Sequence, residues 1–499
     1  MANRRDQAHA YRFMMRRQTS ALLEDHPDGS DVPTHRLSVA AVTSLVIAAL
    51  VTAGFGIAGL VSPGQSASWR TGDVLIVEQG TDTRMVYSGG VLHPVLNLTS
   101  ARLLLGSSTL TVDSVSAGSL SGVPRGLPVG IPGAPEEIPG PSALLTEPWS
   151  TCTYPSVDAS GQVHPYVRLT VGAPVPGTDL PAADSMLVAA PDGTEYLIWN
   201  DQRFRLSGAD AQAALGYAAA APLPVGAAWI DTVPQGPDLT APAIPDEGEQ
   251  ISAIGGRPAL AGQLFQVTGV DTAPQYYAAY PDGLAAITAT QADLLLADPG
   301  SQAAYPGASV ALLPLSEGDV SAAPRSAQRP ALAAGLPSAP PHLAGVGGAG
   351  IAVCSVFSDP SGSSLDVDIR TQVLSPAQLA ATPPGTSPVG DQGGPAADQV
   401  VVAPGHGAVV QALPAPGAET GTVFLVTDLG VKYPLTSSSL LASLGLGGVS
   451  PTPVPDDILQ LLRTGPRLDR ADAAETVPVL PDANGVPQPQ IPVPAASGS

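Results

Sequence analysis

The chain has 499 residues, a formal net charge of −22 at pH 7 and 44% hydrophobic residues. Nucleic-acid binding depends on lysine and arginine neutralising phosphates, so this acidic balance argues against a nucleic-acid partner, and Lys432 is the only lysine. The length exceeds what one compact core usually holds, which predicts two or more modules.

The first 36 residues form a leader with six arginines. Tyr11, Met15 and Leu22 recur at helical spacing and predict an amphipathic helix over roughly Arg5 to Leu23. Such a helix could lie on anionic membrane lipid or dock a cytoplasmic partner. The alternative is a solvated helix that only orients the next segment of the chain.

Residues Leu37 to Val61 carry 25 positions without an ionisable side chain. A helix of that length reaches about 37 Å, against about 30 Å of hydrocarbon, so we expect a single transmembrane helix. The arginines before it place the N-terminus in the cytoplasm and the 438 residues after position 61 outside the inner (plasma) membrane. A cleaved signal peptide is the rival interpretation, although the leader is long for one.

Cys152 and Cys354 are the two cysteines of the chain. On an oxidising exterior two such thiols pair, so we expect a disulfide. The alternative is two buried, unpaired thiols. The absence of a nearby histidine disfavours a metal site at these cysteines.

An internal repeat relates two parts of the body. Residues 203–239 align without gaps to residues 432–468 at a constant offset of 229. Phe204 matches Tyr433, and Leu215-Gly216 matches Leu444-Gly445. Each copy predicts two aromatic-rich strands and then two short helices, the first ending at the glycine, which is a ββαα module.

Two weaker relatives, residues 85–106 and 276–297, share an aromatic strand, a glycine turn, a second strand and a helix with three leucines. We therefore expect an α+β fold with one N-terminal transmembrane helix, followed by an elongated extracytoplasmic region of four ββαα-type repeats around a β-rich central domain. The central domain is expected to contain a flexible insertion near residues 382–397. The predicted division is: 1–36 leader; 37–61 transmembrane helix; 62–130 first repeat; 131–190 central part with Cys152; 191–245 second repeat; 246–318 third repeat; 319–415 central part with Cys354; 416–470 fourth repeat; 471–499 flexible tail.

Several segments together resemble one known family, the EccB membrane component of the actinobacterial type VII (ESX) secretion system. They are YRFMMRR (11–17), GVLHPVLNLTSARLLLG (90–106), LPVGIPGAPEEIPG (127–140), WSTC (149–152) and GPDLTAPAIPDEG (236–248). The resemblance implies one membrane span, repeat units around a central domain, and a disulfide. It also implies a core complex with EccC, EccD and EccE, and self-association into dimers or hexamers.

The motifs of common enzyme sites are missing from the sequence, so no catalytic residue and no cofactor are predicted. Family members are named ATPases, but a P-loop needs G-x-x-x-x-G-K-[ST] and Lys432 is followed by Tyr433. The GVGGAG string at 345–350 follows prolines and precedes a strand-like run, so we interpret it as a turn. His93, His164, His342 and His406 are scattered without metal-ligand spacing, and no G-x-S-x-G elbow occurs.

The sequence therefore predicts a membrane-anchored structural component of the type VII secretion complex, whose extracytoplasmic repeats form inter-subunit or conduit surfaces. One alternative is an anchor that binds peptidoglycan. The other is an ATP hydrolase.

Overall fold

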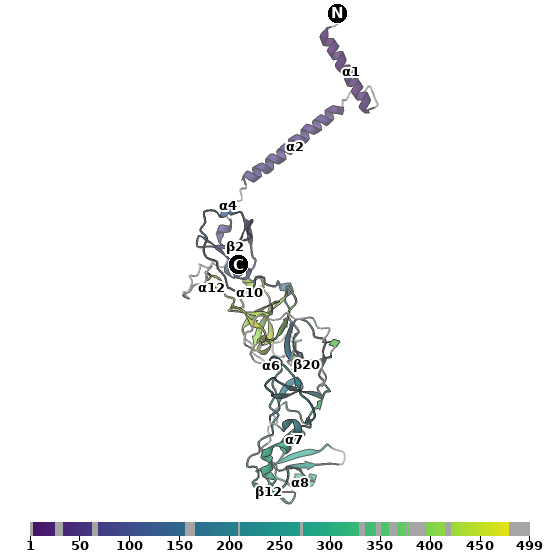
Figure 1. Cartoon of the computed structure of the whole chain (residues 1–499), viewed down its shortest axis with the longest axis vertical. Coiled ribbons are helices and arrows are strands. Elements are labelled where there is room, and N and C mark those ends of the chain that lie inside the picture. The colour runs from purple at the N-terminus through teal and green to yellow at the C-terminus, as the bar shows by residue number, and fades with distance from the viewer. Residues whose placement is uncertain are drawn as a thin grey trace, which may run out of the picture.

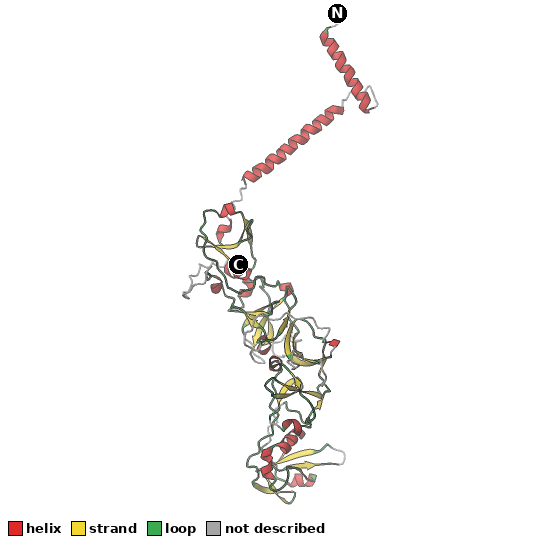
Figure 2. Ribbon diagram, in the orientation of Figure 1, coloured by secondary structure: helices red, strands yellow, loops and turns green. Residues whose placement is uncertain are grey.

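The computed structural model describes residues 3–24, 33–61, 68–154, 165–207, 210–269, 273–328, 335–345, 351–358, 368–375, 377–378, 396–414 and 421–478. Two N-terminal helices precede an elongated body built of small sheets and short helices (Figures 1 and 2).

The N-terminal helices are α1 (Arg4–Glu24) and α2 (Pro33–Val61). The position of α1 agrees with the helix predicted over residues 5–23. The transmembrane helix predicted over residues 37–61 is wrong: in the described parts of the chain, no helix combines the length and apolarity that crossing a bilayer requires. The prediction counted only ionisable side chains. A sufficient length and the absence of charge do not by themselves establish the apolarity that a spanning helix needs.

Four of the six sheets formed by the described residues share one strand order. In each, three antiparallel strands are followed by a helix, a fourth strand parallel to the first, and a second helix. We call these units 1 to 4. Unit 1 contains β1 (Leu75–Glu78), β2 (Arg84–Ser88), β3 (Val91–Pro94), α3 (Leu98–Leu105), β4 (Val112–Val115) and α4 (Ala117–Leu120). Unit 2 contains β8 (Asp184–Ala189), β9 (Glu195–Trp199), β10 (Gln202–Arg205), α5 (Ala211–Ala214), β11 (Leu223–Pro224) and α6 (Ala227–Thr232).

Units 3 and 4 repeat this order. Unit 3 contains β14 (Leu264–Val267), β15 (Gln275–Tyr280), β16 (Gly283–Ile287), α7 (Ala289–Ala297), β17 (Leu312–Pro314) and α8 (Glu317–Ala322). Unit 4 contains β22 (Gly407–Leu413), β23 (Val423–Thr427), β24 (Val431–Leu435), α10 (Leu440–Ser443), β25 (Thr452–Pro455) and α11 (Asp456–Leu459). The predicted ββαα order is therefore incomplete, because it omits the first strand and the strand between the helices. The predicted domain boundaries stay a prediction.

The residues aligned at the offset of 229 make the same backbone contacts. Leu206 pairs in parallel with Leu239, and Leu435 pairs in parallel with Leu468. Gly216 and Gly445, which follow α5 and α10, both have a φ of 82°. Glycine adopts this left-handed conformation without a steric penalty, so it ends the helix in both units.

The fifth large sheet lies in the middle of the body and has the order β21-β6-β5-β19-β20-β7. Its strands come from two distant parts of the chain: β5 (Trp149–Tyr154), β6 (Tyr166–Val171), β7 (Thr178–Asp179), β19 (Ala352–Ser358), β20 (Asp368–Leu374) and β21 (Gln399–Val401). The chain thus leaves this central sheet, builds units 2 and 3, and returns to it. The insertion predicted near residues 382–397 lies almost wholly outside the described residues.

The parts of the body lie in one row (Figure 1), and apolar clusters join neighbouring parts. Leucines of α3 in unit 1 share a core with Leu441 and Leu468 of the unit 4 region. Trp229 of α6 and Ile458 of α11 share a second core with the central sheet. Leu294 of α7 joins the core of unit 2. The order in space is therefore unit 1, unit 4, central sheet, unit 2, unit 3.

The remaining elements are small. The strand pair β12 (Gln250–Ile254) and β13 (Arg257–Leu260) precedes unit 3, β18 (His342–Leu343) pairs with β8, and β26 (Arg463–Thr464) pairs with β24. Three 3₁₀ turns are also described: η1 (Ser68–Thr71), η2 (Pro141–Ala143) and η3 (Pro299–Ala304). Helix α12 (Arg470–Ala473) contacts α3, and Thr476 pairs with Val129 of the unit 1 region. The described residues of the predicted tail thus lie against unit 1, and residues 479–499 lie outside the described ones.

A ring on the third strand of a unit is matched by a glycine after its last helix. A Cβ atom on Gly126, Gly236 or Gly465 would overlap the ring of His93, Phe204 or Tyr433, respectively. In unit 3 the strand residue is the small Ala285, and the glycine position is taken by Ser326, whose N–H donates to Leu284 as the N–H of Gly465 donates to Lys432. The ring and the glycine therefore form one packing pair.

We expect Gly465→Ala to lower the free energy of unfolding by about 1–3 kcal/mol, because the added methyl group overpacks the site against the Tyr433 ring. Urea unfolding of the full chain measures this change. Gly140→Ala is the control, since a Cβ atom there would meet nothing within 4 Å and should shift the midpoint little. Equal shifts for the two variants would contradict the packing pair.

Candidate functional site: the junctions between units

A basic side chain on the third strand supports the last helix in two of the units. Arg203 donates to the carbonyl of Ile230 and forms a 2.9 Å ion pair with Asp231. At the aligned position, the Nζ atom of Lys432 donates to the carbonyl of Leu459 at 2.6 Å. Lys432 is only 7% exposed, and burial lowers its pKa. The one lysine of the chain therefore supports a helix end inside unit 4.

The junction between units 1 and 4 is filled by arginine side chains. Helix α3 begins at Asn97, whose side chain accepts from the N–H of Ser100, and its leucines pack against α10. Arg470 donates to the carbonyl of Leu104 at 3.0 Å. Its guanidinium lies 2.8 Å from where a Cβ atom on Gly106 would stand, so the glycine leaves room for it. Arg102 lies in the same way against Gly445, at the carboxyl end of α10.

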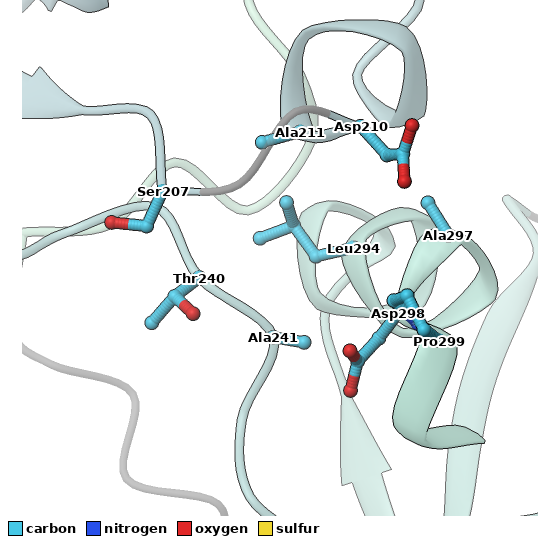
Figure 3. Close-up of a pocket in the computed structure, with 9 residues that line it drawn as sticks. All are labelled: Ser207, Asp210, Ala211, Thr240, Ala241, Leu294, Ala297, Asp298 and Pro299. Atoms are coloured by element: carbon cyan, nitrogen blue, oxygen red, sulfur yellow. The ribbon is translucent and has the colours of Figure 1, made fainter. Parts of the chain in front are cut away.

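The junction between units 2 and 3 contains a cleft instead (Figure 3). Helix α7 begins with a capping box between Thr288 and Gln291, and its Leu294 points toward α5. The cleft beside Leu294 has a volume of about 170 Å³. Its lining consists of Ser207, Asp210, Ala211, Thr240, Ala241, Leu294, Ala297, Asp298 and Pro299.

Carboxylates dominate the electrostatics of this second junction. Asp210 stands at the start of α5, and Asp298 at the end of α7, where it also accepts from the N–H of Gly300. Burial raises the pKa of Asp293 on α7. Burial also raises the pKa of Glu247, and the Asp298 carboxylate raises it further. Among the residues that line the described cleft there is no arginine and no lysine.

We expect Glu247→Gln to stabilise the protein at pH 7. The folded-state pKa of Glu247 is raised above its ordinary 4.5. At a pH above the folded-state pKa the carboxylate is charged in both states, and its charge lowers the free energy of unfolding. This cost disappears as the pH falls below 4.5, so the advantage of glutamine should vanish near pH 4. Thermal unfolding at pH 7 and pH 4 measures it, with the exposed Glu249→Gln as control. A constant advantage at both pH values would contradict this origin.

The structure brings the two predicted cysteines together. Cys152 on β5 and Cys354 on β19 lie directly opposite each other and form a disulfide, with 4.0 Å between their Cα atoms. Both are fully buried beside Tyr154 and Leu374. The expectation of a disulfide is confirmed, and the alternative of two unpaired thiols is wrong.

The other sequence motifs do not assemble into a site in the described residues. His93 donates through Nδ1 to the carbonyl of Leu127 and packs over Gly126, while His342 is exposed and His406 is half-buried. His164 and most of the GVGGAG string lie outside the described residues. No group of metal-ligating side chains occurs in the part of the chain that the structure describes.

Sequence reasoning missed Arg470 and the residues of the cleft. The signal was available: Arg470 stands two positions after Leu468, and Ala241 stands two positions after the aligned Leu239. Residues that the two copies share predict the fold of the repeat. The cleft is instead indicated by a position at which the copies differ, Ala241 in one and Arg470 in the other.

Comparison with known proteins identifies the family. The family model described as "Type VII secretion system ESX-1, transport TM domain B", which represents EccB, matches residues 2–481. The chain belongs to the EccB family. It is 33% identical to the ESX-3 secretion system ATPase EccB3 of Mycolicibacterium smegmatis over 94% of this chain and 90% of that protein. It is 28% identical to the ESX-1 secretion system ATPase EccB1 of Mycobacterium tuberculosis over 96% and 97% of the two chains.

Chains in solved structures of ESX assemblies have the same fold. An EccB3 dimer from the ESX-3 core complex is similar with a TM-score of 0.62 and 28% identity, over 80% of this chain and 99% of that chain. The periplasmic assembly from the ESX-5 inner membrane complex is similar with a TM-score of 0.63 and 25% identity, over 85% and 100% of the two chains. The resemblance to EccB drawn from the sequence is thus confirmed.

Proposed function

We propose that this EccB-family chain is a structural component of an ESX type VII secretion inner membrane complex, and that its units form surfaces between subunits. The row of units carries this proposal. Each pair of neighbouring parts shares an apolar core, and the buried disulfide joins two strands of the central sheet. The body is therefore a cross-linked, elongated rod. A rod of this kind holds partners at fixed positions, which is the task of a scaffold.

The body formed by residues 68–478 is proposed to lie on the periplasmic side. The buried disulfide supports this placement because such bonds persist in oxidising compartments. The related periplasmic assembly, whose match covers 85% of this chain, supports it as well. Protease added to intact spheroplasts should digest the body; survival of the body while true exterior markers are cut would overturn the placement.

The partners are proposed to be a second copy of the chain and components of the EccC, EccD and EccE type. The affinity-tagged chain should retain these components after gentle solubilisation of the cell envelope. A Trp229→Ala variant, which removes a large, fully buried side chain at the contact between α6 and the central sheet, should retain less than Trp229→Phe. Recovery of the tagged chain alone, as a monomer by mass measurement, would overturn the proposal.

The names of the curated relatives include ATPase, so hydrolysis needs its own test. We expect phosphate release by the purified chain to equal that of a buffer blank. Lys432, the one lysine that could meet a phosphate, donates to Leu459 and lies 5.3 Å from the Phe424 ring. Magnesium-dependent release that is lost in Lys432→Met would contradict this expectation. The peptidoglycan-binding alternative stays a prediction, which sedimentation with purified cell wall tests.

A further inference from the structure

The fourth strand of each unit lies at one edge of its sheet and leads into the last helix. In three units a proline stands two residues before the N-cap of that helix: Pro224 in unit 2, Pro314 in unit 3 and Pro453 in unit 4. In unit 1 the same position holds Ser114. Unit 1 therefore lacks a residue that the other three units share at this edge.

The proline faces away from the sheet in the units that carry it. The residue after it points inward: the N–H of Val225 donates to the carbonyl of Ala189, and the N–H of Leu315 donates to that of Gln266, both at 3.0 Å. Backbone groups alternate in direction along a strand, so the proline nitrogen lies on the outer side. A proline there offers no N–H to a further strand and closes the edge.

The outer side of β4 in unit 1 is open. The N–H of Gln79 donates to the carbonyl of Val115 at 2.9 Å, so the backbone groups of Val112 and Ser114 point outward. Among the described residues, the N–H groups of these two have no acceptor, and the carbonyl of Ser114 receives only the side chain of Gln79, at 3.2 Å. The Val112 side chain is 54% exposed. This edge can therefore pair with another extended segment.

The sequence of the chain's own end contains an edge-strand pattern. Ile491-Pro492-Val493 repeats the order found in the fourth strands, where a proline stands between two residues that face the sheet: Leu223-Pro224-Val225, Leu313-Pro314-Leu315 and Thr452-Pro453-Val454. A further proline follows at position 494. In an extended backbone the N–H groups of residues 491 and 493 point to one side and the prolines to the other.

The segment is long enough to reach β4. The described chain ends at position 478 beside the opposite edge of unit 1, where the N–H of Val477 donates to the carbonyl of Pro128 and Thr476 pairs with Val129. From there to the outer side of β4 the sheet measures about 29 Å, at about 4.8 Å per strand. The 13 residues from 478 to 491 (491 minus 478) span up to about 43 Å.

We propose that residues 491–494 of this chain pair with the outer edge of its own β4 as an additional strand of unit 1, and that their prolines terminate the sheet. The pairing gives the N–H groups of Val112 and Ser114 the acceptors that they lack among the described residues. The strand comes from the same chain because position 478 lies at this unit and the intervening residues span the distance. This inference goes beyond the scaffold role and does not depend on it.

Hydrogen exchange in the purified full chain tests the pairing, in peptides that cover residues 110–116 and 488–496. Val493→Pro removes an N–H that donates to β4, so we expect the amides of β4 to exchange at least about 10-fold faster. Pro492→Ala is the matched control, because position 492 faces outward and the N–H of Val493 remains. Equal exchange of β4 in the wild type and in Val493→Pro would overturn the proposal.

Variants of β4 test the other side of the pairing. Ser114→Pro introduces the residue that the other units carry, so unit 1 should keep its fold while the amides of peptide 488–496 exchange at least about 10-fold faster. Ser114→Ala keeps the N–H and should leave their exchange unchanged. Slow exchange that survives Ser114→Pro, or that is lost equally in Ser114→Ala, would overturn the proposal.

Co-expression of Ser114→Pro and Val493→Pro chains identifies the source of the strand. Each chain then lacks one half of the contact, so pairing within one chain predicts fast exchange of both peptides. Slow exchange restored in the mixture would show that the strand passes between two copies and would overturn the assignment to the same chain. Slow exchange that requires another protein would overturn it as well.

Discussion

Replacing both Cys152 and Cys354 with alanine is expected to lower the free energy of unfolding by about 5 kcal/mol. The disulfide closes a loop with a sequence separation of 202, and the entropy that such a cross-link removes from the unfolded chain grows with the logarithm of loop length. Units 2 and 3 lie inside that loop. If they stay folded when the central sheet opens, the effective loop is shorter and the effect is correspondingly smaller.

Urea unfolding of the full chain, followed by tryptophan fluorescence, measures this loss. Trp149 is a suitable reporter because it is fully buried on β5, the strand that carries Cys152. A reductant should destabilise the wild type toward the double variant and leave the double variant unchanged. Equal unfolding midpoints for the oxidised wild type and the double variant would show that the cross-link contributes nothing measurable.

Trp229→Ala should cost about 3–5 kcal/mol, the range for deleting a large buried aromatic side chain. Trp229 is fully buried on α6, which contacts β5 and β19 of the central sheet. Its cluster also contains Ile458 of α11, so one cavity would loosen the contact among unit 2, unit 4 and the central sheet. The damage should therefore spread beyond unit 2.

Hydrogen exchange resolves where the damage occurs. Amides of β5, β19 and β22 should lose protection in Trp229→Ala, while those of β14 to β16 in unit 3 should keep it, since unit 3 has separate clusters. Trp229→Phe is the matched control and should lose less, because the phenyl ring retains much of the buried area. A loss of protection that is uniform over all units would contradict the division of the core.

Much of the unit architecture could be predicted from local patterns. Local sequence is enough to predict the aromatic strands separated by tight turns and the helix-ending Gly216 and Gly445. The disulfide is predicted from the redox state of the compartment. The strands Leu223–Pro224 and Arg463–Thr464 could not be predicted this way. Each is two residues long and becomes a strand only because its neighbour in space is already one.

The candidate cleft could not be predicted from composition or spacing. Asp210, Ala241 and Asp298 are ordinary loop and cap residues in sequence, and they meet only because α5 and α7 pack together. The helix over residues 37–61 shows the opposite error. There a strong local pattern, a run of 25 positions without an ionisable side chain, was extended to a transmembrane prediction.

The return of the last described helix to the first unit sets the order in which the protein can be completed during synthesis. The hydrogen bond from Arg470 to Leu104 joins residues 366 positions apart. At about 5–20 residues per second, a ribosome needs about 20–70 s to bridge that distance. Unit 3 closes on itself within one short stretch of translation. The leucines of α3 meanwhile stand uncovered, so the unit that is made first is the last to be finished.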